Sequence, residues 1–142
     1  MIGILIISHG PLAEGILESS RFFYDDHRCI RTQVLAKEDD PSAFFQTLKH
    51  ACEAFEDVED ILILTDIPGG TPANTAQMLM QDNPHIRLLS GVNLMMALDA
   101  VLSREMYDLD ALAQHCRQSA IDSIQLIGGQ EYAETDDVNA EF

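Results

Sequence analysis

The chain begins with an apolar run, Ile2-Gly3-Ile4-Leu5-Ile6-Ile7, which stops at Ser8-His9-Gly10-Pro11. A second run, Ile61-Leu62-Ile63-Leu64, stops at Thr65-Asp66-Ile67-Pro68-Gly69-Gly70-Thr71-Pro72. Short continuous apolar runs of this kind are typical of parallel strands that are buried on both faces. A histidine and a carboxylate therefore follow two buried strands. In an open α/β sheet ligands bind at this end of the strands, so we expect chemistry there.

The rest of the chain alternates between strand-type runs and helical periods. The pattern predicts strands over residues 2–7, 29–35, 60–65, 86–89 and 124–127. It predicts helices over residues 11–24, 41–55, 72–81, 94–103 and 109–120. Strands that alternate with helices imply a mainly parallel sheet with helices on both of its faces.

This alternation predicts the α/β fold class, as a doubly wound sheet with the flavodoxin-like strand order 2-1-3-4. In that order the first and third strands are neighbours, so His9 and Asp66 are expected to flank one crevice. The 142 residues suit one domain with its own core. We assign residues 1–130 to that domain and residues 131–142 to an acidic C-terminal tail.

Composition argues against several functional classes. Twenty-four acidic residues against eight Lys and Arg give a net charge of −16, which argues against nucleic acid or an anionic membrane as a partner. Proteins with basic faces are better candidates, although solubility alone explains the acidity equally well. Three widely spaced cysteines predict neither a disulfide framework nor a zinc site. Because no signal peptide or membrane-spanning run is evident, we expect a cytoplasmic location.

His9 is the candidate nucleophile. A neutral imidazole can attack phosphorus through one ring nitrogen and carry the phosphoryl group as a covalent adduct. The other nitrogen then needs a hydrogen-bond partner that fixes the tautomer, and Asp66 is the candidate for that partner. The alternative interpretation makes His9 an ordinary turn residue, but its position at the end of a strand beside Gly10 favours chemistry.

The segment Gly69-Gly70-Thr71-Pro72 is the candidate phosphate-binding loop, together with Gly10. Glycines allow the backbone N–H groups to approach a ligand closely. Thr71 is predicted as an N-cap and Pro72 as the first helical residue, so the free amides at this helix start would bind an anion. A Gly-Gly turn that only changes the chain direction is the alternative.

The remaining motifs carry less chemistry. His27, His50, His85 and His115 are dispersed and show no metal-ligand spacing, so no metal site is expected. Nucleotide P-loop, dinucleotide-binding and nucleophile-elbow motifs are absent from the sequence. The loop Ser90-Gly91-Val92-Asn93 either closes over the crevice or provides Asn93 as a helix cap.

Three motifs in register give a family resemblance. Strand-Ser8-His9-Gly10, the segment from Thr65 through Asn74, and Ser90-Gly91-Val92-Asn93-Leu94 together resemble the IIA component of the mannose-type family of the bacterial phosphoenolpyruvate-dependent sugar phosphotransferase system. This family includes mannose, sorbose and N-acetylgalactosamine branches. The resemblance spans about the first 105 residues, and it does not identify the sugar.

The resemblance implies a specific mechanism. The histidine phosphocarrier protein HPr would phosphorylate His9, which would pass the group to a IIB component acting with the membrane components IIC and IID. Asp66 would orient His9, while Thr71 and the neighbouring amides would hold the phosphoryl oxygens. Neither a metal nor a cofactor is implied. The family also implies a homodimer with an exchanged C-terminal strand, here residues 124–127, and the chain end implies a separate IIB protein.

Three alternatives stay open at this stage. A phosphorylation-dependent regulatory module of the same fold would accept phosphate on His9 and switch a bound protein. The phosphocarrier subunit that serves dihydroxyacetone phosphorylation has a related histidine domain, although the glycine motifs fit the sugar branch better. An aspartate-phosphorylated receiver domain shares the fold class, but it requires acidic residues where this chain has Ser8-His9-Gly10.

Overall fold

The computed structural model describes residues 1–129 of the chain. Its helices and strands alternate as the sequence predicts. In chain order they are β1 (Gly3–His9), α1 (Leu12–Ser20), a 3₁₀ turn (Arg21–Phe23), β2 (Ile30–Leu35), a second 3₁₀ turn (Pro41–Ala43), α2 (Phe44–Glu53), β3 (Ile61–Thr65), α3 (Thr71–Gln81), β4 (Ile86–Leu89), α4 (Leu94–Ser103) and α5 (Leu109–Asp122).

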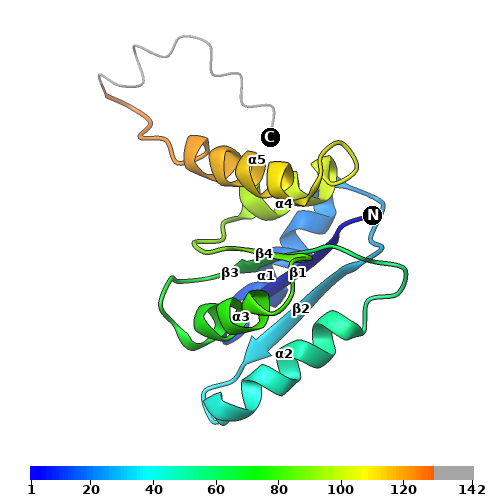
Figure 1. The fold of residues 1–142 in the computed structure, drawn as a ribbon. Helices are drawn as coiled ribbons and strands as arrows, with labels where there is room; N and C mark the ends of the chain where they lie inside the picture. Colours follow the sequence, from blue (N-terminus) through cyan, green and yellow to red (C-terminus); the bar gives the residue numbers. More distant parts are fainter. Residues whose placement is uncertain (130–142) are drawn as a thin grey trace.

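The four strands form one parallel sheet in the order β2-β1-β3-β4, which confirms the predicted topology (Figure 1). Ile7 of β1 lies opposite Thr65 of β3, and His9 lies opposite Leu35 of β2. Because parallel strands end at the same edge, this register brings His9 and Asp66 to one edge of the sheet. We call it the carboxyl edge.

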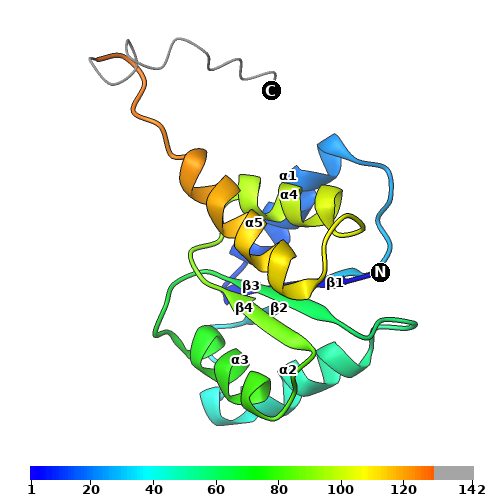
Figure 2. The same cartoon turned by 45° about the horizontal axis from the view of Figure 1, so that its top comes forward.

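Helices cover both faces of the sheet, as the doubly wound fold requires (Figure 2). Alternate residues of β1 point to opposite faces. Ile4 and Ile6 pack with α1, α4 and α5, whereas Leu5 and Ile7 pack with α2 and α3. All four side chains are at most 1% exposed, and each contributes about 1.5–3 kcal/mol by leaving water. The buried β1 therefore holds His9 at a fixed place.

One sequence prediction about the elements is wrong, and the predicted last strand is not formed within the described part of a single chain. The first helix ends at Ser20 and tightens into a 3₁₀ turn, because Tyr24 is already extended. Residues 124–127 follow α5 without regular secondary structure and without a pairing strand among residues 1–129. Ile124, Leu126 and Ile127 are 78%, 69% and 71% exposed. Strand exchange in a dimer remains a prediction, and the predicted acidic tail lies outside the described residues.

Among residues 1–129, none of the helices combines the length and the apolar character that crossing a bilayer requires.

Candidate functional site

His9 and Asp66 meet at the carboxyl edge of the sheet. The His9 Nδ1 atom lies 2.7 Å from Asp66 Oδ2, and the His9 backbone amide donates to the same oxygen at 2.9 Å. The His9 side chain is 46% exposed, whereas that of Asp66 is only 10% exposed. A partner molecule can therefore reach the imidazole, while the carboxylate behind it is held within the protein.

The environment of Asp66 keeps its carboxylate charged. Burial alone would raise the pKa of Asp66, but the hydrogen bonds from the His9 amide and ring outweigh burial and lower it. The Thr65 hydroxyl donates to the other carboxylate oxygen at 3.2 Å. A carboxylate only accepts hydrogen bonds, so His9 Nδ1 carries the proton. In the neutral ring the lone pair is then on Nε2.

The two glycines of the loop before α3 have different conformations. Gly69 has φ of +80°, in the left-handed region that favours glycine. Gly70 has φ of −79° and ψ of 168° and serves as the N-cap of α3. The Asn74 amide group donates to the Gly69 carbonyl at 3.0 Å and ties the loop to the helix. Gly70 lies directly against the edge of the His9 ring that carries Nε2.

Helix α3 points its amino end at this ring. Thr71 is the first helical residue and Pro72 the second, so the prediction of Thr71 as the N-cap is wrong by one position. Pro72 has no N–H, and the Asn74 amide donates to the Gly70 carbonyl at 2.9 Å. Within the described residues the amides of Thr71 and Ala73 have no backbone acceptor. Amides without acceptors at the positive end of a helix dipole are the groups that favour an anion.

Gly10 serves the turn after β1. Its φ is +59°, and its amide donates to the Leu35 carbonyl at 2.9 Å. Because that N–H is already used by the sheet, Gly10 gives the chain its change of direction and not a free donor. Of the predicted residues, His9 contacts both Asp66 and Gly70, and Gly69 and Thr71 flank Gly70 in the chain.

Sequence reasoning missed Ser8. Its side chain is fully buried, and its hydroxyl donates to the Gly10 carbonyl at 2.9 Å. The same oxygen accepts from the Ala13 amide at 2.8 Å, so Ser8 caps α1 from the preceding strand. Pro11, at the N-cap position, makes no side-chain cap bond. A serine inside an apolar strand just before the turn was the available signal.

The loop of residues 90–93, which follows β4, holds the backbone next to the site in place. The Gly91 and Val92 amides donate to the carbonyls of Asp66 and Thr65, at 2.6 and 2.9 Å. Asn93 accepts from the Met96 amide at 2.9 Å, which confirms the interpretation of Asn93 as a helix cap. The loop therefore fixes the backbone that carries Asp66.

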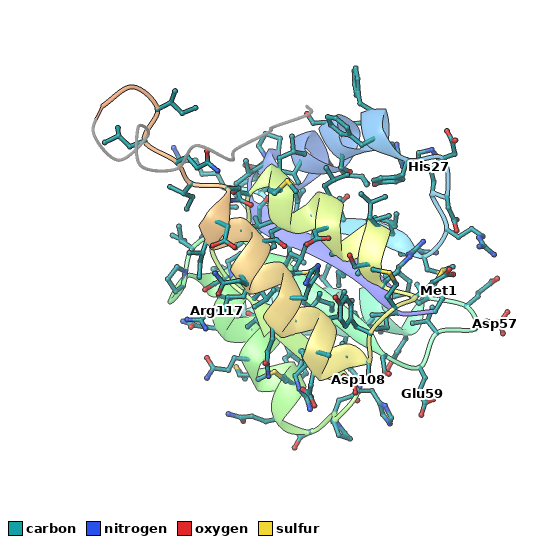
Figure 3. The ribbon with its side chains drawn as sticks, turned by 90° about the horizontal axis from the view of Figure 1, so that it is seen from above. Met1, His27, Asp57, Glu59, Asp108 and Arg117 are labelled. Atoms are coloured by element: carbon teal, nitrogen blue, oxygen red, sulfur yellow. The ribbon has the colours of Figure 1, made fainter. Side chains whose placement is uncertain are left out.

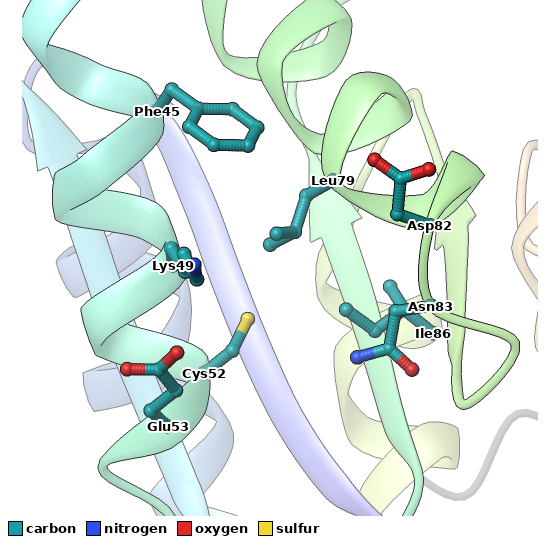
Figure 4. Close-up of a pocket in the computed structure, with 8 residues that line it drawn as sticks. All are labelled: Phe45, Lys49, Cys52, Glu53, Leu79, Asp82, Asn83 and Ile86. Atoms are coloured by element: carbon teal, nitrogen blue, oxygen red, sulfur yellow. The ribbon is translucent and has the colours of Figure 1, made fainter.

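Other chemistry-bearing residues lie elsewhere. A groove of about 280 Å³ between α2 and α3 contains none of the predicted site residues (Figure 4). Burial, with a smaller effect of Glu53, raises the pKa of its Cys52 to about 11, so this thiol stays protonated at neutral pH. In residues 1–129 no group of three or more His, Cys, Asp or Glu side chains could hold a metal ion.

The fold and this edge define a class: a doubly wound α/β protein that presents a carboxylate-held histidine to the amino end of a helix. The sequence matches the mannose-type family described as "PTS system fructose IIA component" over residues 3–117. The chain belongs to this family of sugar phosphotransferase system (PTS) components, as the resemblance in the sequence predicts.

Individual relatives agree with this assignment. The chain is 25% identical to the fructose-specific EIIA component of Bacillus subtilis strain 168 over 126 residues, 89% of this chain and 86% of that protein. It is 28% identical to the sorbose-specific EIIA component of Klebsiella pneumoniae over 120 residues, 84% of this chain and 87% of that protein. The crystal structure of the EIIA component from Streptococcus agalactiae superposes with a TM-score of 0.81 at 31% identity, covering 89% and 97% of the two chains.

Family membership gives this chain a role in phosphoryl transfer during sugar uptake. It is therefore a phosphocarrier of the phosphotransferase system and, in the broad sense, a transferase.

Proposed function

We propose that this chain is a phosphohistidine carrier that accepts a phosphoryl group from HPr on His9 and passes it to a IIB component. The observation that carries the proposal is the 2.7 Å contact between His9 Nδ1 and Asp66, which leaves Nε2 beside the start of α3 without a hydrogen-bond partner among residues 1–129. The reported relatives are sugar-uptake components, which favours transport over the regulatory alternative.

The transfer step follows from the tautomer of His9. The Nε2 lone pair attacks the phosphorus of phosphorylated HPr and forms a P–N bond, while the P–N bond to HPr breaks and its electron pair returns to the HPr imidazole. The His9 proton stays on Nδ1, where Asp66 stabilises the positive charge that develops on the ring. Transfer to IIB reverses this sequence, with the IIB nucleophile attacking the same phosphorus.

The start of α3 would stabilise the transferred group. The amides of Thr71 and Ala73 and the Thr71 hydroxyl would donate to phosphoryl oxygens on the exposed side of the His9 ring. Donors that are fixed before the reaction stabilise developing charge without reorganisation. This set needs no metal or cofactor.

The proposed partners are HPr, a IIB component and, through IIB, the membrane components IIC and IID. The proposed location of the chain itself is the cytoplasm. Nucleic acid is not among them because the chain is strongly acidic. We also propose a homodimer in which residues 124–127 pair with the partner. Their three exposed apolar side chains would then be covered. Truncation before Ile124 should yield a monomer in sedimentation, and a retained dimer would contradict the exchange.

Mass spectrometry tests the carrier role. Incubation with HPr, its upstream kinase and phosphoenolpyruvate should add one phosphoryl group, and peptide mapping should locate it on His9. The P–N bond should be lost in mild acid and survive in base. An unmodified protein, or an acid-stable adduct on a hydroxyl, contradicts the proposal.

A further inference from the structure

The paired glycines before α3 are required for different physical reasons. Gly69 adopts φ of +80°, and a Cβ there would meet nothing within 4 Å among the described residues. The positive φ of residue 69 therefore explains why this position is a glycine. Gly70 has φ of −79°, which any residue adopts. The backbone therefore gives no reason for glycine at position 70.

The reason at position 70 is the His9 ring. A Cβ on Gly70 would lie 2.7 Å from His9 Cε1 and 3.4 Å from His9 Nε2. The first distance is shorter than the van der Waals separation of two carbon atoms. The His9 ring therefore occupies the space that a side chain at position 70 would need. Ile67 Cγ1, at 3.3 Å, closes the same space from another side.

We infer that Gly70 is a positioning residue: the missing side chain lets the imidazole lie on the backbone with Nδ1 on Asp66 and Nε2 facing α3. The catalytic meaning of this contact rests on the proposed function, but the placement of the ring does not. Gly70 thereby selects the nitrogen that is presented for transfer.

Neither the His9 ring nor the loop that carries Gly70 can move easily. The His9 amide and ring both bind one oxygen of a nearly buried carboxylate. The loop is held by the Asn74 bond to Gly69. The open side of His9 is solvent, because 46% of its side chain is exposed. An added methyl group at position 70 therefore turns the ring outward and breaks its bond to Asp66.

The test compares Gly70→Ala with Gly15→Ala. Gly15 lies in α1 and an added Cβ meets nothing within 4 Å among the described residues, so it is the matched control. NMR of the His9 ring nitrogens should show the Nδ1–H tautomer in the wild type and Gly15→Ala, and its loss in Gly70→Ala. Phosphorylation by HPr should slow about 100-fold in Gly70→Ala, as for a reacting group displaced by ~1 Å. An unchanged tautomer with an unchanged rate overturns the inference.

A stability cycle provides an independent test. Gly70→Ala should lower the melting temperature in the wild type but not in His9→Ala, where the ring is gone. If Gly70→Ala alone fails to fold, the double variant should fold. An equal loss in both backgrounds, or two unfolded proteins, assigns the clash to Ile67 or the backbone and overturns the inference. Absence of phosphorylation on wild-type His9 would remove the proposed function yet leave the tautomer and stability measurements decisive.

Discussion

Two of the three histidine–aspartate pairs in residues 1–129 lie at opposite edges of the sheet, and the third, His115 with Asp99, joins α5 to α4. At the carboxyl edge His9 Nδ1 lies 2.7 Å from Asp66, and at the amino edge His85 Nδ1 lies 2.9 Å from Asp60. Both imidazole side chains are 46% exposed. By the contact alone, the two pairs are equivalent.

Their surroundings differ. Asp66 is 10% exposed and receives both the amide and the ring of its histidine, whereas Asp60 is 37% exposed. His9 Nε2 faces Gly70 at the start of α3, but His85 Nε2 lies 3.7 Å from the Glu59 carboxylate. Figure 3 shows Glu59 with Asp57 and Asp108 along the amino edge. An incoming phosphoryl group would meet helix-start amides at the first pair and a carboxylate at the second, which is why we propose the first pair as the phosphoryl site.

The largest expected effect separates the two histidines. His9→Ala should abolish phosphoryl acceptance from HPr, because the nucleophile is removed, while His85→Ala should keep the wild-type rate within about twofold. Mass spectrometry of both variants after incubation with phosphorylated HPr checks this. Full labelling of His9→Ala, or loss of labelling in His85→Ala, would reverse the comparison.

The second-largest effect on the transfer rate is expected from replacing the two aspartates. Asp66→Ala should slow transfer on the order of 100-fold, because the ring loses the group that fixes its tautomer and stabilises its charge. Asp60→Ala should leave the rate unchanged. Rapid-quench measurement of phosphohistidine formation gives both rates, and circular dichroism confirms that each variant folds. Equal rates for the two variants would make Asp66 a turn residue.

Much of this arrangement can be predicted from the sequence. Apolar runs locate the four strands, and the preference of parallel sheets for helices on both faces fixes their order closely enough to place His9 beside Asp66. Two residues at the ends of neighbouring parallel strands need no side-chain detail to be brought together. The family resemblance adds the phosphoryl chemistry, and the family match confirms that resemblance.

Other features depend on distances that the sequence does not encode. Gly69 and Gly70 cannot be distinguished in the sequence. Gly69 is required by its positive φ, whereas Gly70 is required by the His9 imidazole, 61 positions earlier in the chain. Ser8 caps a helix from the preceding strand, outside the local capping pattern. Residues 124–127 have an apolar pattern, which predicts that they are buried. The pattern does not indicate whether the strand that pairs with them belongs to the same chain or to a second one.

The hydroxyl of Thr71 should have a smaller effect than Asp66. Thr71→Val keeps the shape of the first turn and its amides but removes one donor, so transfer should slow about tenfold, equivalent to ~1.4 kcal/mol for a hydrogen bond to a charged group. Thr47→Val, on the exposed face of α2, is the control. A wild-type rate for Thr71→Val in steady-state transfer assays would mean that the Thr71 hydroxyl does not bind the phosphoryl group and that only the amides do.

The smallest effect concerns stability in acid and depends on the carboxylate at the carboxyl edge. Hydrogen bonds from His9 outweigh the burial of Asp66 and lower its pKa. A group with a lowered folded-state pKa contributes stability above its unfolded pKa of about 3.9 and loses it as the pH falls through the folded value. Between neutral pH and pH ~3 the wild type should therefore lose a few degrees more in melting temperature than Asp66→Asn. Differential scanning calorimetry of both proteins over this pH range measures the difference. Parallel curves for the wild type and Asp66→Asn would mean that the carboxylate contacts at the carboxyl edge serve transfer without stabilising the fold.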